Sequence, residues 1–205
     1  ILYSPDAPVI PSPPPYLRRN AVSDNFASPH DRDLGERVRP PGWINPPPAP
    51  RYDLVVVGAG TAGLVCAAGA AGLGARVALV ERHRLGGDCL NYGCVPSKAL
   101  IRAARAAHDA GNGAPFGVTG CDGTGVDGAA VMERMRRLRA AIGRHDAAER
   151  FRDLGVHVFF GQGSFISRNA LEVDGRRLNF VRAAVCTGAR AAAPPIPGLA
   201  EAGYL

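Results

Sequence analysis

A glycine-rich turn between two apolar runs constrains the fold of this chain more than any other feature. Residues 53–57 are a short run rich in valine, residues 76–80 are a second apolar run, and an Ala/Gly-rich stretch at 62–74 separates them. Short runs with β-branched residues predict buried strands, and the longer stretch predicts a helix. A strand–helix–strand unit of about 30 residues has parallel strands. The chain is therefore predicted to be an α/β protein with a Rossmann-like parallel sheet.

The turn itself, Gly58-Ala59-Gly60-Thr61-Ala62-Gly63, has the spacing of a dinucleotide-binding turn. Gly58 allows the tight turn, Gly60 lets a pyrophosphate approach the backbone, and Gly63 lets helix and strand pack closely. The N-terminus of the helix adds partial positive charge. Glu81 follows the second strand, where a carboxylate can accept hydrogen bonds from a ribose diol and disfavours a 2′-phosphate. FAD and NAD are both compatible with these residues.

The stretch from Leu54 to Ala75 has no charged residue and is long enough to suggest a membrane span. It contains six glycines, however, and its first part is β-branched. We expect a buried strand, a turn and a buried helix there instead.

The most informative stretch is 86–98, which reads Gly-Gly-Asp-Cys-Leu-Asn-Tyr-Gly-Cys-Val-Pro-Ser-Lys. Four residues lie between Cys89 and Cys94, so the two thiols can close a small disulfide ring. Cys94 precedes a predicted helix at 95–110, whose N-terminal dipole favours a thiolate. Lys98, one helical turn further, adds positive charge on the same side. The spacing and the lack of a nearby histidine cluster argue against zinc, so no metal site is predicted.

This stretch closely resembles the redox motif of the class I pyridine nucleotide–disulfide oxidoreductases, which include dihydrolipoamide dehydrogenase, glutathione reductase and mercuric reductase. Residues 186–190 (Cys-Thr-Gly-Ala-Arg) resemble the strand and Thr-Gly turn that close the first half of the family's FAD domain. Residues 161–164 (Gly-Gln-Gly-Ser) resemble the segment whose backbone meets the adenine. The resemblance covers about 51–205 and is nearest in character to mercuric-reductase-like proteins.

The resemblance implies FAD as cofactor and unequal roles for the two thiols. Cys89 would be the interchange thiol that attacks substrate, Cys94 the flavin-proximal thiol of the charge-transfer pair, and Lys98 a neighbour of the isoalloxazine ring. Asp88 departs from the threonine that many relatives have near the pyrophosphate, so it is given no phosphate contact. The residues expected to contact FAD are Gly58, Gly60, Gly63, Glu81, Gly87, Lys98, Gly163, Thr187 and Gly188.

Much of a complete family member is not in these 205 residues. A second glycine fingerprint for the nicotinamide nucleotide, the second half of the FAD domain and the C-terminal interface domain with its His–Glu pair are all missing. We therefore expect a fragment that is inactive alone, with NAD(P)H bound by a domain absent from the chain. The full-length protein is expected to be a homodimer that reduces a small-molecule acceptor, either a disulfide or a metal ion.

Proline marks a different region at the N-terminus, where 13 of the 18 prolines fall within residues 1–50. This composition predicts an extended leader, followed by the FAD-binding domain at 51–205. Residues 41–46 are similar to linkers of relatives fused to a membrane domain, so a tether upstream is left open. The segment is also predicted to dock on the body through Trp43.

The formal net charge of +6 comes from dispersed arginines without an aromatic binding motif, so no nucleic acid partner is expected. Five cysteines without a signal peptide favour a cytoplasmic location, where a disulfide is more often catalytic than structural. Cys66 and Cys186 are expected to be small core residues, and Cys121 a loop thiol.

In the second half, Asp127 is a plausible cap for a long helix that stops by Gly155 and whose apolar face carries Val131, Met135, Leu138 and Ile142. Short strands follow, with Gly175 in a hairpin turn. They are expected at 156–160, 164–167, 170–173, 177–180 and 182–186. Two other functions stay open on the sequence: a non-catalytic nucleotide-binding or membrane-tethered module, and a flavoprotein whose cysteines bind metal.

Overall fold

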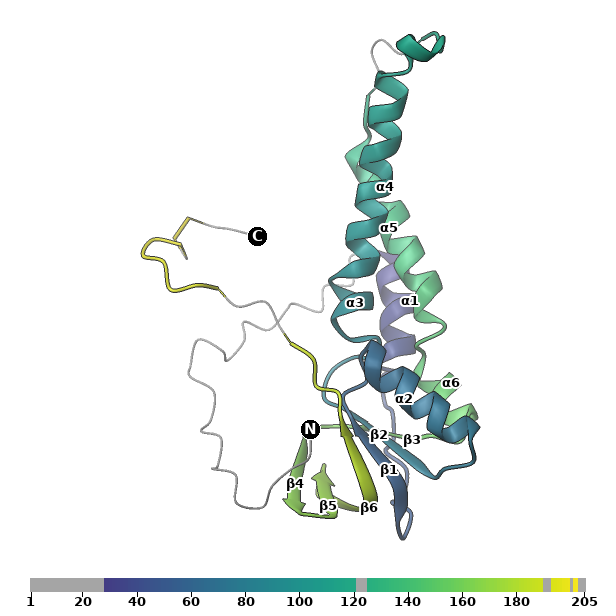
Figure 1. Ribbon diagram of the computed structural model, residues 1–205, viewed down its shortest axis with the longest axis vertical. Helices are drawn as coiled ribbons and strands as arrows, with labels where there is room; N and C mark the ends of the chain where they lie inside the picture. Colours follow the sequence, from purple (N-terminus) through teal and green to yellow (C-terminus); the bar gives the residue numbers. More distant parts are fainter. Residues whose placement is uncertain (1–27, 121–124, 190–192, 200, 203–205) are drawn as a thin grey trace.

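The computed structural model describes residues 28–120, 125–189, 193–199 and 201–202, and its centre is one six-stranded sheet (Figure 1). The strands lie in the order β3-β2-β1-β6-β5-β4, of which β3, β2, β1 and the second part of β6 are parallel. Their bounds are β1 Tyr52–Val57, β2 Val77–Glu81, β3 His157–Phe160, β4 Gly163–Ser167, β5 Ala170–Val173 and β6 Arg176–Val185. The predicted α/β fold with a parallel sheet and a small antiparallel segment is confirmed.

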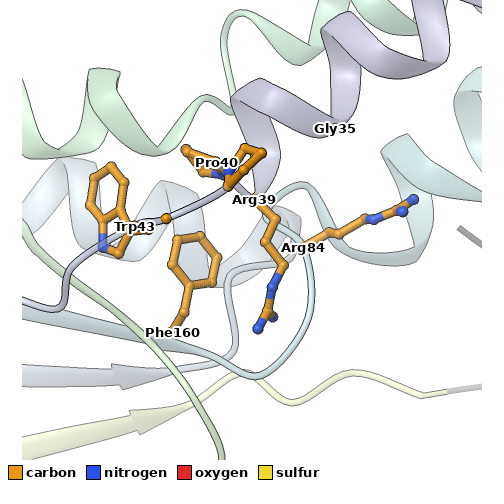
Figure 2. Close-up of a pocket in the computed structure, with 8 residues that line it drawn as sticks. Gly35, Arg39, Pro40, Trp43, Arg84 and Phe160 are labelled. Carbon is orange, nitrogen blue, oxygen red and sulfur yellow. The ribbon is translucent and has the colours of Figure 1, made fainter.

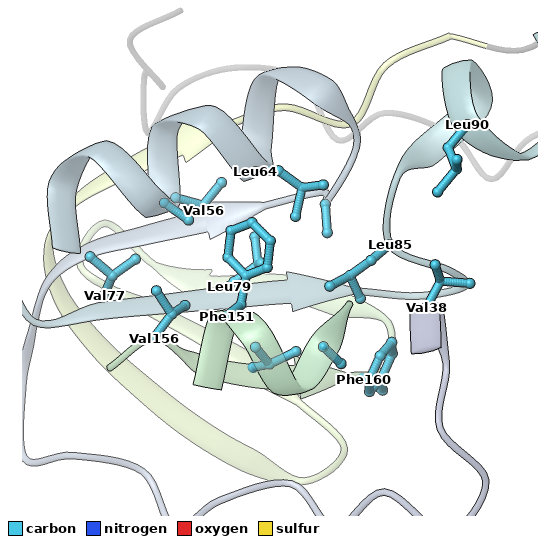
Figure 3. Close-up of a cluster of buried hydrophobic side chains, with 14 of the residues drawn as sticks. Val38, Val56, Leu64, Val77, Leu79, Leu85, Leu90, Phe151, Val156 and Phe160 are labelled. Carbon is cyan, nitrogen blue, oxygen red and sulfur yellow. The ribbon is translucent and has the colours of Figure 1, made fainter. Parts of the chain in front are cut away.

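The parallel strands are buried on both faces because alternate side chains enter two different cores. On one face, Val56 and Leu79 pack beneath the helices, in the cluster that Figure 3 shows. On the other face, Val55 and Val80 pack against apolar residues of β5 and of the first part of β6, such as Leu171. The antiparallel part of the sheet thus covers one face of the parallel strands, and the helices cover the other face.

Strand β6 differs from the sequence prediction because it is one strand of ten residues and not two short ones. Its first part pairs antiparallel with β5, through Val173↔Arg176 to Ala170↔Asn179. Its second part pairs parallel with β1, up to Val57↔Val185. A strand that changes neighbours needs no turn, so the expected break near residue 181 is absent. The hairpin turn at Gly175 is confirmed, with Asp174 at φ 50° and Gly175 at φ 68°.

The helices lie largely on one side of the sheet, where α4 and α5 extend away from it together (Figure 1). The predicted long helix is interrupted between α5 and α6. Its buried residues in α5 are Met135, Ala140 and Gly143, whereas Ile142 is 41% exposed, so the predicted apolar face is wrong at its C-terminal end. The bounds are α2 Thr61–Gly72, α3 Gly87–Asn91, α4 Cys94–Gly111, α5 Gly128–Gly143 and α6 Ala148–Asp153. A short 3-10 turn at Ala114–Phe116 follows α4.

The uncharged stretch from Leu54 to Ala75 folds as predicted into a buried strand, a turn and a helix, which are β1, the glycine turn and α2. Across the described ranges, no helix combines the length and the apolar character that crossing a membrane requires.

The prediction of an extended leader over 1–50 is wrong for residues 29–38, since Pro29–Val38 form helix α1, whereas residues 39–50 contain no helix or strand. Ser28 caps this helix by accepting a hydrogen bond from the backbone N–H of Asp31, and Pro29 stands at its first position. Leu34 and Val38 are buried in the main core. The many prolines favoured an extended segment in the prediction. The spacing of Leu34 and Val38, one helical turn apart, was overlooked, although it lets this helix pack against α5. Residues 1–27 and Cys121 lie outside the described residues.

The chain after α1 runs along the edge strand β3, as the predicted docking of Trp43 requires. Trp43 Nε1 donates to the carbonyl of Val158 at 3.2 Å. The Asn45 side chain donates to the carbonyl of Phe160 and accepts from its N–H, both at 2.8 Å. These bonds satisfy backbone groups that an open edge would leave unpaired.

Tyr52 and His157 give this edge a dependence on pH. The fully buried Tyr52 hydroxyl accepts from the N–H of Ala49 and lies 2.8 Å from His157 Nδ1, to which it donates a hydrogen bond when the neutral imidazole carries its proton on Nε2. Burial, followed by the nearby Arg76 charge, lowers the pKa of His157. Because the folded-state pKa is depressed, the stability that this pair contributes is present above the unfolded pKa of about 6.5 and is lost as pH falls below it.

We therefore expect the melting temperature of the His157→Gln variant to fall less than that of the parent between pH 8 and pH 5. Glutamine can still accept from Tyr52 but does not titrate. His108→Gln, at a side chain 75% exposed, should follow the parent. Identical pH profiles for parent and His157→Gln, measured by circular dichroism, would contradict the assignment.

Candidate functional site

The carboxyl ends of the four parallel strands meet at one edge of the sheet, where ligands bind in open α/β folds. Gly58 follows β1, Glu81 ends β2, Gly161 follows β3, and Cys186 follows β6. The backbone N–H of Gly58 donates to Val80 and that of Gly161 to Glu81, so the turns after the strands are tied to one another. The strand order therefore gathers most of the predicted cofactor-contacting residues.

Two glycines of the turn are required by close backbone approaches. Gly58 has a φ of +101°, and a Cβ there would overlap the carbonyl oxygen of Cys186. A Cβ at Gly63 would overlap the carbonyl oxygen of Gly58 and lie 3.3 Å from Val56 Cγ1. Helix α2 can therefore start directly against β1. Its cap, Gly60, has no side chain to bond the first N–H groups, which leaves that helix end able to receive an anion.

The Glu81 carboxylate is buried at the end of β2 and is held by two backbone N–H groups. Oε2 accepts from Ala59 and Oε1 accepts from His83, each at 2.7 Å. Each carboxylate oxygen retains acceptor capacity beyond these single bonds. Glu81 thus fixes the glycine turn and remains able to accept hydrogen bonds from a ligand's hydroxyl groups.

The segment that carries the two cysteines, residues 86–98, is attached directly to the glycine turn. The N–H of Gly86 donates to the carbonyl of Ala59 at 2.8 Å, and Gly86 has a φ of +86°. A Cβ on Gly87, whose φ is +57°, would lie 2.6 Å from the Cα of Gly60. The two backbones approach so closely that a side chain at position 87 would not fit between them.

This attachment brings the cysteine pair to the start of α2. Cys89 lies in the short helix α3, and Cys94 is the first residue of α4, which Gly93 caps. Cys94 and the Thr61 hydroxyl act on the pKa of the Cys89 thiol in opposite directions, since Thr61 lowers it. The hydrogen bond with Cys94, then burial, raises the pKa of Cys89 above its ordinary value. Both thiols are free in the structure.

The remaining predicted site residues lie at different distances from this centre. Thr187 and Gly188 follow β6, with the Cα of Thr187 3.1 Å from where a Cβ of Gly58 would be. Gly163 begins β4 against Val80, beyond the end of β3. Lys98 is exposed, one turn after Cys94 on α4. Their contacts with FAD stay predictions, and Arg190 lies outside the described residues.

Sequence reasoning missed Thr61 and helix α3. Thr61 is the variable position of the glycine fingerprint, so the pattern gives it no role. Helix α3 spans only five residues, too few for a periodic apolar pattern. No group of three His, Cys, Asp or Glu side chains placed to hold a metal ion is found within the described ranges.

A separate cavity of about 320 Å³ lies beside the ends of β2 and β3. Figure 2 shows the N-terminal segment on one side of it and Phe160 on another. Trp43 meets the Phe160 ring edge-on at 5.8 Å, and the Arg39 guanidinium lies 5.2 Å from the same ring. Arg39 also donates to the carbonyls of Arg82 and His83. Neither Cys89 nor Cys94 lines this cavity. The hydrogen bonds from Arg39 hold the loop after Glu81 in place.

Comparison with known proteins gives a match over most of the chain. The family model described as pyridine nucleotide-disulphide oxidoreductase matches residues 52–205. A mercuric reductase from Bacillus cereus is 36% identical over 154 residues, which are 75% of this chain and 24% of that protein. A dihydrolipoyl dehydrogenase from Acholeplasma laidlawii is 35% identical over 151 residues, which are 74% of this chain and 45% of that protein.

Among solved structures, the HOCl-induced flavoprotein disulfide reductase RclA from Escherichia coli superposes with a TM-score of 0.57 at 29% identity. The superposition covers 73% of this chain and 31% of that one. The chain thus spans from a quarter to less than half of the length of these relatives. Helix α1 and Trp43 precede the residues that the family model matches.

The close approach at Gly63 yields a prediction about stability. Gly63→Ala should lower the free energy of unfolding by about 1–3 kcal/mol, because its methyl group overlaps the Gly58 carbonyl. Gly69→Ala is the matched control in the same helix, where a Cβ meets nothing within 4 Å. That variant should gain roughly 0.5–1 kcal/mol from helix propensity. Urea unfolding followed by circular dichroism measures both, and equal stability of the two variants would show that the approach is not close.

Proposed function

Because this chain belongs to the pyridine nucleotide-disulphide oxidoreductase family, we propose that it carries the FAD site and the redox-active cysteine pair of a disulfide reductase. One observation supports this most directly: the segment that carries Cys89 and Cys94 meets the glycine turn at the start of α2, where a Cβ on Gly87 would lie 2.6 Å from the Cα of Gly60. A thiol pair in that place can exchange electrons with a cofactor held by the same turn. The activity of the whole protein is part of the proposal, since the relatives are much longer.

The residues present fit FAD. The Gly58–Gly63 turn leaves the first N–H groups of α2 without a side-chain cap, as a pyrophosphate requires. Glu81 would accept from the ribose hydroxyls, and the backbones of Gly87, Gly163, Thr187 and Gly188 would complete the site. Lys98 would add positive charge beside Cys94. When bound, FAD supplies two-electron transfer between a nicotinamide nucleotide and the cysteine pair.

The two thiols can carry out disulfide exchange with unequal roles. Cys89, as thiolate, attacks one sulfur of an acceptor disulfide, which releases one thiol and leaves a mixed disulfide on Cys89. Cys94 then attacks the Cys89 sulfur, which releases the second thiol and forms the Cys89–Cys94 bond. The N-terminus of α4 would stabilise negative charge on Cys94, whereas the contact with Cys94 and burial raise the pKa of Cys89, so the two thiols are not equivalent.

The acceptor is proposed to be a small disulfide or a metal ion, because relatives of both kinds match the chain at similar identity. The hydride source is proposed to be NADH or NADPH, bound outside this chain. A homodimer of the full-length protein is part of the same proposal.

Cysteine counting tests the proposed pair in the 205-residue chain. After oxidation with glutathione disulfide, the denatured parent should show two more reactive thiols when it is first treated with dithiothreitol. Cys89→Ser and Cys94→Ser should each lose that difference of two, since the cysteine that remains can release at most one thiol, from a mixed disulfide with glutathione. The Ellman reaction provides the count.

Cys66→Ser is the matched control, since Cys66 is half-buried on α2, and it should keep the difference of two thiols. An unchanged thiol count in the parent would overturn the redox assignment. A difference that survives in Cys89→Ser would assign the disulfide to other cysteines.

A further inference from the structure

A network of polar side chains connects helix α1 to the backbone between the two redox cysteines. The Arg139 guanidinium on α5 donates through Nη1 to the carbonyl of Asn91 at 2.9 Å. Through Nη2 it donates to Asp31 Oδ1 at 2.5 Å, which forms an ion pair. Arg139 is therefore bonded on one side to α1 and on the other side to the end of α3.

Asn91 is the residue that closes the redox segment upon itself. It is 2% exposed and lies between Cys89 and Cys94. Its side-chain amide donates to the carbonyl of Leu85 at 3.1 Å and to that of Gly87 at 2.8 Å. Displacement of Asn91 would thus move the start of the segment and the chain between the cysteines together.

Two buried atoms in this network have no hydrogen-bond partner among the described residues: Asn91 Oδ1 and Arg139 Nε. Leaving buried polar groups unpaired is costly, and a simple packing contact between α5 and α3 would be made with apolar side chains. The guanidinium is instead bonded to a backbone carbonyl on one side and a carboxylate on the other, which fixes its orientation between α1 and α3.

We propose that Arg139 is a positioning residue for the Cys89–Cys94 pair, and that Asp31 sets its orientation from helix α1. A guanidinium can donate to a carbonyl and a carboxylate at once in a fixed fork, which a lysine cannot do. Asp31 is largely buried and comes before residues 52–205, so this control comes from outside the part of the chain that the family model matches. The inference rests on the proposed function and adds a determinant of how readily the disulfide forms.

The equilibrium between the dithiol and the disulfide tests this. The parent and variants are equilibrated with mixtures of reduced and oxidised dithiothreitol, trapped with a maleimide and counted by mass spectrometry. Arg139→Gln, Arg139→Lys and Asp31→Asn should each shift the equilibrium toward the dithiol by about three- to ten-fold, because the thiols are less well oriented for ring closure. Asp31→Glu, which keeps the charge, should stay within about two-fold of the parent.

Arg136→Gln is the matched control. Arg136 lies on the same helix and contacts Asp31 at 3.5 Å, and its described ion pairs are with Asp31 and Glu133. It should leave the equilibrium within about two-fold of the parent, since the link to Asn91 is intact. Melting curves report folding separately. Variants that melt lower with an unchanged equilibrium constant would show a merely structural role and overturn the inference, while the proposed function would stand. A parent with no reducible pair would overturn the proposed function itself.

Discussion

The contact between the backbones of Gly60 and Gly87 determines how the rest of this site is arranged. A side chain at Gly87 would collide with Gly60, and the neighbouring Gly86 N–H is bonded to Ala59. Two segments that are separate motifs in the sequence thereby become one surface. The glycine turn and the cysteine pair lie next to each other, so the thiols would be close to a cofactor if the turn binds one as proposed.

The parallel sheet holds the two segments that make this contact in fixed positions. Parallel pairing places the ends of β1, β2, β3 and β6 at one edge, and the switch of β6 from β5 to β1 brings Cys186 under Gly58. A helix cannot occupy the face that β5 covers, which explains why the helices gather on the opposite face. Glu81 then joins strand and turn through its two backbone hydrogen bonds.

Much of this was predictable because each element carries a local pattern. The glycine spacing, the valines of β1 and the two cysteines act over a few residues, and a one-dimensional sequence displays such patterns well. What escaped prediction depends on partners distant in sequence. Helix α1 is stabilised by α5 about a hundred residues later, as the Asp31–Arg139 pair shows. The continuity of β6 likewise depends on β1, and near the end of α5 the neighbours Ala140 and Gly143 face the core whereas Ile142 is exposed.

These long-range partners give the N-terminal segment a structural role that its composition does not suggest. It closes the edge of β3 through Asn45, supports the loop after Glu81 through Arg39, and fixes Arg139 through Asp31. The three contacts lie at the edge of the sheet, at the loop that follows Glu81, and at the segment that carries the two cysteines. A segment bonded to all three can transmit changes at the N-terminal side of the protein to the redox pair without touching either thiol. If Arg139 positions the cysteine pair as we propose, the equilibrium between dithiol and disulfide depends on residues that come before and after β1 in the sequence, and the glycine turn connects them.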